Sequence, residues 1–443
     1  MNIRSLFLTG LFMAASLTMH AQEQQPSTGL PPKASLEQCI DFALRNKANV
    51  KQAAIDQEIG ERDIASALSG WFPQIGATGT YNNNIIIPTA VIGDQVIQMG
   101  QRNVAALVLQ ADQQIVNPAL LQASKAAKYV RLQNEQNTEN TKINTIVEVS
   151  KAYYDILTSE EQLSIIKENI ARITKQLQDA KARYETGIVD KTDFKRAQIT
   201  LSNSNADLKR TAAILKYKYA YLKEVVGLSP EAPLTLSFDN TSMESEISLD
   251  TTVAFDYRNR IEYRQLQTQR QLQGINTQYN KWTYLPSLSA FYNYAWDYRN
   301  NSFSKLLDVD YPRSVFGLTL NVPIFQGMKR TQEIRKSQLM EERIDWDLVN
   351  LRNQINSQYE MAMATYKANL NDWVTARENV ELSKEVYNTI KLQYDEGIKT
   401  YLDLMTAETD LRTTQVNYLN ALYAVLSGKL DVQRAVGTIQ TAR

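Results

Sequence analysis

Histidine and cysteine are almost absent from this 443-residue chain. The only histidine is His20 and the only cysteine is Cys39. Without His20, which lies in an expected leader, the chain has no Ser-His-Asp or Cys-His catalytic centre and no zinc site built on histidine. One cysteine cannot form an internal disulfide, and we expect Cys39 to be packed among its apolar neighbours. The composition thus indicates a protein that is not an enzyme and needs no metal or cofactor.

Long apolar runs are equally scarce. An apolar run at residues 6–17 follows Arg4 and precedes Met-His-Ala at residues 19–21, the pattern of a secretory signal. We therefore expect residues 1–21 to be removed and the mature protein to be exported. No later stretch reaches the ~18–20 apolar residues of a spanning helix. The net charge is +0, so it favours neither nucleic acid nor an anionic surface as a partner.

Proline is missing from two long stretches, residues 119–229 and 324–443. Segments of 69 residues (187 − 118) and 70 residues (397 − 327) lead to Gly187 and Gly397. Such breaker-free segments predict helices of roughly 100 Å, each followed by a returning helix of about 40 residues. Shorter segments at residues 35–70 and 251–285 predict further helices. The length of one long helix would then equal the combined length of two shorter helices stacked end to end.

The glycines that end these segments belong to an internal repeat. Tyr-Glu-Thr-Gly-Ile begins at residue 184 and Tyr-Asp-Glu-Gly-Ile at residue 394, an offset of 210 (394 − 184). Six residues after the glycine stands an aspartate in each copy, Asp193 and Asp403. This period exceeds the ~20–50 residues of solenoid repeats, so it predicts a duplicated half-molecule.

The duplication divides the chain into halves. We expect an N-terminal linker at residues 22–34 and a first repeat at residues 35–227. An equatorial linker at residues 228–250 then leads to a second repeat at residues 251–437 and a tail at residues 438–443. Apolar residues at heptad spacing in residues 166–184 and 376–394 predict coiled-coil helices. An ordinary coiled-coil stalk remains an alternative, because periodicity alone does not distinguish it.

Each half also contains two segments that alternate between apolar and polar residues. They predict β-strands at about residues 74–84, 104–116, 287–297 and 314–325. Runs of ~10 residues match transmembrane strands, and Tyr292, Tyr294 and Trp296 suit an interfacial aromatic girdle. The connections, at about residues 83–103 and 299–313, are expected to be polar exposed loops. A soluble β-subdomain is the alternative.

Four strands cannot close a membrane barrel, because the smallest barrels have ~8 and lipid does not tolerate an open edge. Membrane strands would therefore require several chains. Three chains would supply 3 × 4 = 12 strands. The fold class predicted from these residues is mainly α with a small membrane β part, in a homo-oligomer.

At these motifs the chain resembles the TolC-like outer-membrane efflux proteins. The resemblance rests on the two repeat motifs that begin at residues 184 and 394, called the tip motifs below. It rests also on residues 317–327, which read Gly-Leu-Thr-Leu-Asn-Val-Pro-Ile-Phe-Gln-Gly. It implies a fold of long helices that trimerises into a 12-stranded barrel on an α-helical tunnel. The barrel would lie in outer-membrane lipid, and the tunnel would form a long periplasmic extension. It further implies an exit duct for an inner-membrane pump reached through a periplasmic adaptor protein, with no nucleic acid involved.

The resemblance also assigns roles to individual residues. Asp193, Tyr394 and Lys399 fall at the family's gate positions, which link neighbouring hairpins. Asp403 falls at the first acidic ring of the pore entrance, whereas the second acidic position is Thr406 here. Gly187 and Gly397 fall at the tips that contact the adaptor.

Two alternatives remain open from the sequence. Asp193 and Asp403 each follow a turn and precede an apolar run, so both could act as helix N-caps. The whole chain could instead be a soluble periplasmic coiled-coil adaptor or structural protein. The exported substrate is not encoded in any of these patterns.

Overall fold

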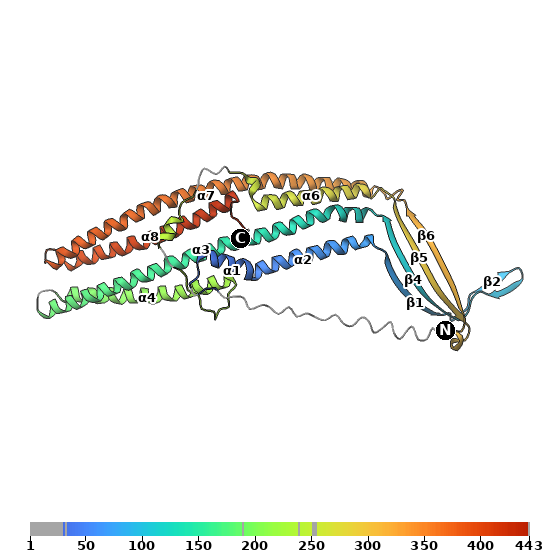
Figure 1. The fold of residues 1–443 in the computed structure, drawn as a ribbon, viewed down its shortest axis with the longest axis horizontal. Coiled ribbons are helices and arrows are strands. Elements are labelled where there is room, and N and C mark those ends of the chain that lie inside the picture. The colour runs from blue at the N-terminus through green and yellow to red at the C-terminus, as the bar shows by residue number, and fades with distance from the viewer. Residues whose placement is uncertain (1–29, 32, 188–189, 238–239, 250–254, 442–443) are drawn as a thin grey trace.

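The computed structural model describes residues 30–441 except 32, 188–189, 238–239 and 250–254. The expected signal peptide and Ile188 of the first tip motif lie outside these residues. The molecule is long and narrow, with a four-stranded sheet at one end and two helical hairpins at the other (Figure 1). Long helices connect the two ends.

Long helices account for most of both halves. In the first half they are α1 (Leu36–Asn46), α2 (Ala48–Leu68), α3 (Pro118–Glu185) and α4 (Lys191–Val226). In the second half they are α6 (Ile261–Trp282), α7 (Lys329–Asp395) and α8 (Tyr401–Val436), after a short α5 (Asn240–Ser245). None of the described helices is both long enough and apolar enough to cross a membrane.

The two shorter helices differ from the expected single segments. The helix predicted over residues 35–70 is broken at Lys47, whose extended backbone (φ −60°, ψ 130°) separates α1 from α2. The helix predicted over residues 251–285 begins only at Ile261, after the short 3₁₀-helix η3 (Tyr257–Asn259). In both halves the break lies beside the end of a returning helix, α4 in the first half and α8 in the second.

Two glycines form these junctions. Gly227 ends α4 and Gly437 ends α8, both with φ of +80°. A Cβ on Gly227 would lie 2.8 Å from the Cα of Lys47, and one on Gly437 would lie 2.8 Å from the backbone oxygen of Asn259. Each returning helix therefore ends against the start of a shorter helix. The predicted end-to-end stacking is confirmed.

The sheet has the order β1–β4–β5–β6, with every pair antiparallel. Its strands are β1 (Gln74–Asn83), β4 (Asn103–Val116), β5 (Ser287–Asn300) and β6 (Asp310–Asn321). The first two agree with the expected segments. The strand expected at residues 314–325 lies four residues earlier in the chain, since it ends before Pro323, which has no N–H to donate to a ladder.

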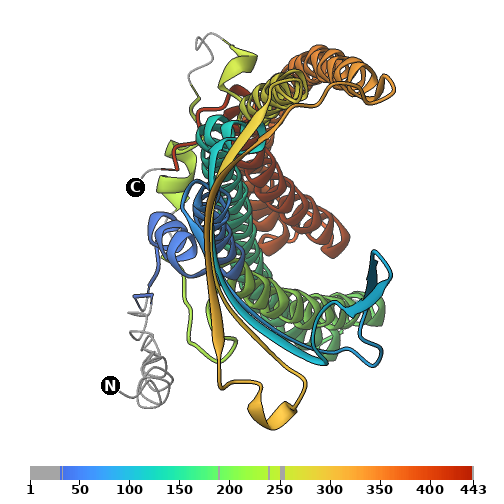
Figure 2. The same ribbon diagram turned by 90° about the vertical axis from the view of Figure 1, so that its right-hand side faces the viewer.

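The connection expected to be a polar loop at residues 83–103 contains a β-hairpin. Its strands are β2 (Thr89–Ile92) and β3 (Gln95–Gln98), joined by Gly93 and Asp94. A Gly-Asp pair between apolar residues is a hairpin signal, so this structure could have been predicted. Figure 2 shows the hairpin on the concave side of the curved sheet.

The main hydrophobic core lies at the junction level. It joins α1, α3, α4 and α8 through fully buried residues such as Ile156, Leu222 and Val425. Cys39 is buried here, as expected. The equatorial segment contributes too: Leu236 forms a parallel bridge with Ala34, and Met243 enters the same core.

Candidate functional site at the helical tips

Both helical hairpins reverse direction at a glycine. Gly187 and Gly397 each have φ of +75°, and a Cβ at either position would meet no atom within 4 Å. Each glycine N–H donates a 3.0 Å hydrogen bond to the carbonyl of the tyrosine three residues earlier, Tyr184 or Tyr394. The repeat therefore has the same backbone turn in both copies, and the tip surface around it is open.

The helix caps lie one turn before the expected aspartates. Asp190 caps α4 by accepting from the N–H of Thr192, and Thr400 caps α8 by accepting from the N–H of Asp403. The N-cap alternative is therefore wrong for Asp193, which stands in the first turn. Asp403 takes part in a capping box, because its carboxylate accepts from the Thr400 N–H at 3.0 Å.

The same hydrogen bonds affect the charge of Asp403. Its carboxylate also accepts from the Thr400 hydroxyl at 2.8 Å. These bonds from Thr400 lower the pKa of Asp403, and the nearby Lys399 lowers it further. Asp403, which is half-buried, therefore keeps its negative charge at neutral pH.

Tyr394 lies between the two hairpins. The guanidinium of Arg183, on α3, lies 5.1 Å from the centre of its ring. On its other side, the Tyr401 ring of α8 meets it edge-on at 6.1 Å. Burial raises the pKa of Tyr394, Arg183 lowers it and the carboxylate of Asp193 raises it. The carboxylate of Asp193 is thus close enough to Tyr394 to act on it electrostatically.

Lys399 behaves differently from the other two gate candidates. Its side chain is exposed, and in the described part of the chain no ion pair joins it to Asp193. The cation that lies over the Tyr394 ring is instead Arg183, which immediately precedes the first repeat motif but was not assigned a role from the sequence. The gate residues are therefore only partly brought together within one chain.

A small apolar cluster holds the hairpins together near the tips. We call it the tip cluster; its buried members are Ala197, Tyr387, Tyr394, Tyr401, Leu404, Ala407 and Leu411. Three of the seven are tyrosines, which pair apolar rings with polar hydroxyls. The hydroxyl of Tyr401 is buried and has no hydrogen-bond partner within the described chain.

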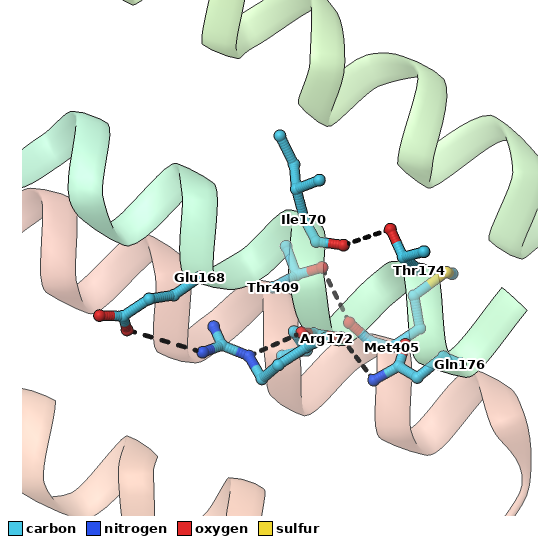
Figure 3. A network of polar contacts seen from close by, with 8 residues as sticks. Glu168, Ile170, Arg172, Thr174, Gln176, Met405 and Thr409 are labelled. Atoms are coloured by element: carbon cyan, nitrogen blue, oxygen red, sulfur yellow. Dashed lines mark hydrogen bonds and ion pairs between the residues drawn. The ribbon is translucent and has the colours of Figure 1, made fainter.

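A buried carboxylate next to the tip cluster forms a polar link between the hairpins. Glu408 of α8 accepts from Arg172 Nε at 3.1 Å and from Gln176 Nε2 at 2.9 Å, both on α3. Figure 3 shows Arg172 and Gln176 directed toward the α8 segment that carries Met405 and Thr409. Sequence reasoning missed this link, because a glutamate beside an apolar seam residue is normally solvent-exposed.

Within the described ranges, no group of three or more His, Cys, Asp or Glu side chains is placed to hold a metal ion. What the site offers is a packed contact between two hairpins, a buried charge pair and exposed residues at an open tip. These contacts hold the two hairpins together close to their tips.

Known proteins of similar sequence cover almost the whole chain. It is 21% identical to the outer membrane protein TolC of Vibrio cholerae over 414 residues, 91% of both chains. It is 22% identical to the outer membrane efflux protein BepC of Brucella suis over 445 residues, 96% of this chain and 91% of the relative.

Solved structures show the same fold. CusC superposes with a TM-score of 0.76 at 14% identity, covering 91% of this chain and 92% of that structure. The Campylobacter jejuni CmeC outer membrane channel superposes with a TM-score of 0.73 at 16% identity, covering 91% and 85%. The sequence profile described as "Outer membrane efflux protein" matches residues 39–228 and 259–438, one segment in each half. The chain therefore belongs to the outer membrane efflux protein family.

Proposed function

We propose that three copies of this outer-membrane efflux protein form one passive exit duct. Twelve strands would close a barrel in the outer membrane, and the helices would continue it into the periplasm as a tunnel. One observation supports this proposal above all: the sheet and helices of one chain form a single curved layer, and this layer has an open edge on each side. A barrel-forming sheet cannot keep an open edge in lipid.

The open edges run the full length of the molecule. In the sheet, β1 pairs only with β4 and β6 pairs only with β5, which leaves one unpaired edge on each side. In the helical part, α3 packs against helices on both sides, whereas α7 packs mainly against α6 and α8. The free side of α7 carries exposed Trp346, Met361 and Leu392. Two different edges that meet between copies generate a closed ring.

The gate would be completed by contacts between copies. Lys399 is exposed and Asp193 is half-buried beside Tyr394, so each is available to a neighbouring hairpin. A salt bridge between Asp193 and the Lys399 of another copy would draw the tips together. Because such contacts are few and partly exposed, opening the tips would need little free energy.

The experiment is single-channel recording in a planar bilayer. The double variant Asp193→Ala/Lys399→Ala is expected to conduct more than the wild type, because its tips are no longer drawn together. Lys195→Ala, which removes an exposed charge on α4 that contacts only residues of the same helix in the described chain, Gln198 and the Phe194 ring, is the control and should conduct normally. Unchanged conductance in the double variant would refute the gate.

Asp403 would supply one ring of three carboxylates at the tunnel entrance. Asp403→Asn keeps an acceptor for the Thr400 cap but removes the charge, so the preference for cations should fall. Thr406→Asp, which adds a second ring, should increase it. The reversal potential in a salt gradient measures both, and equal values in all three proteins would remove Asp403 from the pore.

The open turns at Gly187 and Gly397 would contact a periplasmic adaptor that links the duct to an inner-membrane pump. The empty space around both glycines supports this assignment, because a partner can approach the backbone closely there. Gly397→Gln should reduce co-purification of a periplasmic adaptor protein, with trimer formation unchanged. Retained adaptor binding would refute the contact.

A further inference from the structure

Both faces of the β2–β3 hairpin carry apolar side chains, and the other residues on them are uncharged: Thr89 and Gln98 on one face and Gln95 on the other. Val91 is opposite Val96 on one face, and Ala90 is opposite Ile97 on the other, where Ile92 also lies. Between residues 84 and 101 the only charged residue is Asp94, in the turn. Ordinary exposed hairpins have one polar face, so this pattern is unusual for a solvated loop.

Both faces are uncovered in the single chain. Val91 and Val96 are 71% and 69% exposed, and Ile92 is 60% exposed. Ile85 and Ile86, just before the hairpin, are each 86% exposed. An isolated two-stranded hairpin is marginally stable in water, and an apolar patch of this kind marks an interaction surface.

The position of the hairpin restricts what can cover it. It projects beyond the ends of the four membrane strands (Figure 1) and lies on the side toward which the sheet curves (Figure 2). Closing the sheet into a barrel puts this concave side inside and the convex side against lipid. The hairpin is therefore directed across the outer mouth of the barrel, away from the bilayer.

We propose that the three β2–β3 hairpins of the trimer pack on one another as an apolar ring across the outer mouth. A three-fold ring uses heterologous contacts, in which one face of each copy meets a different face of the next. A hairpin with exposed apolar residues on two unlike faces provides both halves of such a contact. The proposal rests on the proposed trimer and identifies a second constriction, at the opposite end from the tips.

Disulfide trapping in the outer membrane tests the ring. Cys39 is first replaced by alanine, and then Val91→Cys on one face is combined with Ile97→Cys on the other. Oxidation is expected to produce covalent dimers and trimers on a non-reducing gel, because the two faces meet between copies. Val91→Cys alone and Ile97→Cys alone are matched controls and should give no trimer band.

The oligomeric mass of the detergent-solubilised protein separates the two proposals. Trimers without cross-linking in the double variant would overturn the ring and leave the duct intact, whereas monomers alone would overturn both. A nitroxide spin label at Val96→Cys gives an independent readout. Dipolar broadening between copies is expected, while greater accessibility to oxygen than to an aqueous nickel complex would place the hairpin in lipid and refute the ring.

Discussion

Glu408 on α8 and Arg172 on α3 are joined by a 3.1 Å contact although the Glu408 side chain is only 6% exposed. The pair connects the two hairpins of one chain close to their tips. A buried carboxylate is tolerated only when its charge is paired and its oxygens are hydrogen-bonded. Gln176 satisfies the second oxygen, so the link is complete within the protomer.

Arg172→Ala should therefore destabilise the hairpin contact. It leaves the charge of Glu408 buried and unpaired, and we expect the free energy of unfolding to fall by about 2 kcal/mol. This is less than the usual cost of breaking a buried ion pair, because Arg172 is itself partly exposed. Thermal unfolding followed by circular dichroism measures the change. Arg62→Ala, which breaks an exposed pair with Glu58, should change the melting temperature little; an equal effect of both variants would contradict the prediction.

Gly227→Ala should cost more stability than Gly187→Ala. Both glycines have a left-handed backbone, which costs an L-residue ~1–2 kcal/mol. Only at Gly227 would the new Cβ also collide with backbone atoms, at 2.8 Å from the Cα of Lys47. Parallel melting curves of the two variants provide the measurement. Equal shifts would mean that the junction can open to admit the methyl group.

Two buried tyrosines should respond differently to loss of their hydroxyls. The Tyr366 hydroxyl donates to the carbonyl of Ile247 at 2.9 Å, so Tyr366→Phe should cost about 1–2 kcal/mol. The Tyr401 hydroxyl has no partner in the described chain, so Tyr401→Phe should be neutral or stabilising. Denaturant unfolding of both variants tests this, and a cost at Tyr401 would reveal a partner on a neighbouring copy.

Stability at alkaline pH should depend on Cys39. Burial raises the pKa of its thiol to about 12, whereas an unfolded thiol titrates near ~8.5. Its contribution to stability is therefore complete below about pH 8.5 and is lost as pH rises through about 12. The melting temperature should fall less steeply with pH in Cys39→Ala than in wild type. Identical slopes, or fast reaction of the native thiol with an aromatic disulfide, would contradict the buried position.

The long helices and membrane strands were predictable because they follow from simple spacing. The absence of proline over residues 119–229 determined α3 and α4, and alternation determined β1 and β4 almost to the residue. The break at Lys47 was not predictable in this way. It depends on Gly227, which approaches Lys47 only after the chain has folded back.

The candidate site was less accessible to sequence reasoning than the fold. The repeat located both turns, since these depend on local motifs, whereas the pairing of Asp193 with Tyr394 was expected only from the family resemblance. The repeat did not reveal Arg183 against Tyr394, or Glu408 between Arg172 and Gln176. Those contacts join residues more than 200 positions apart, and helical periodicity says which face a residue occupies but not which residue it will meet.

The direct connection from strand to long helix has a mechanical consequence. β4 ends at Val116 and α3 begins at Pro118, so only Asn117 separates the sheet from a helix that runs without a break to the tip. Such a helix is a lever arm: tilting a ~100 Å rod by about one degree moves its far end by about 2 Å. Small adjustments of strand tilt at the membrane would therefore be amplified into ångström-scale changes of aperture at the periplasmic end.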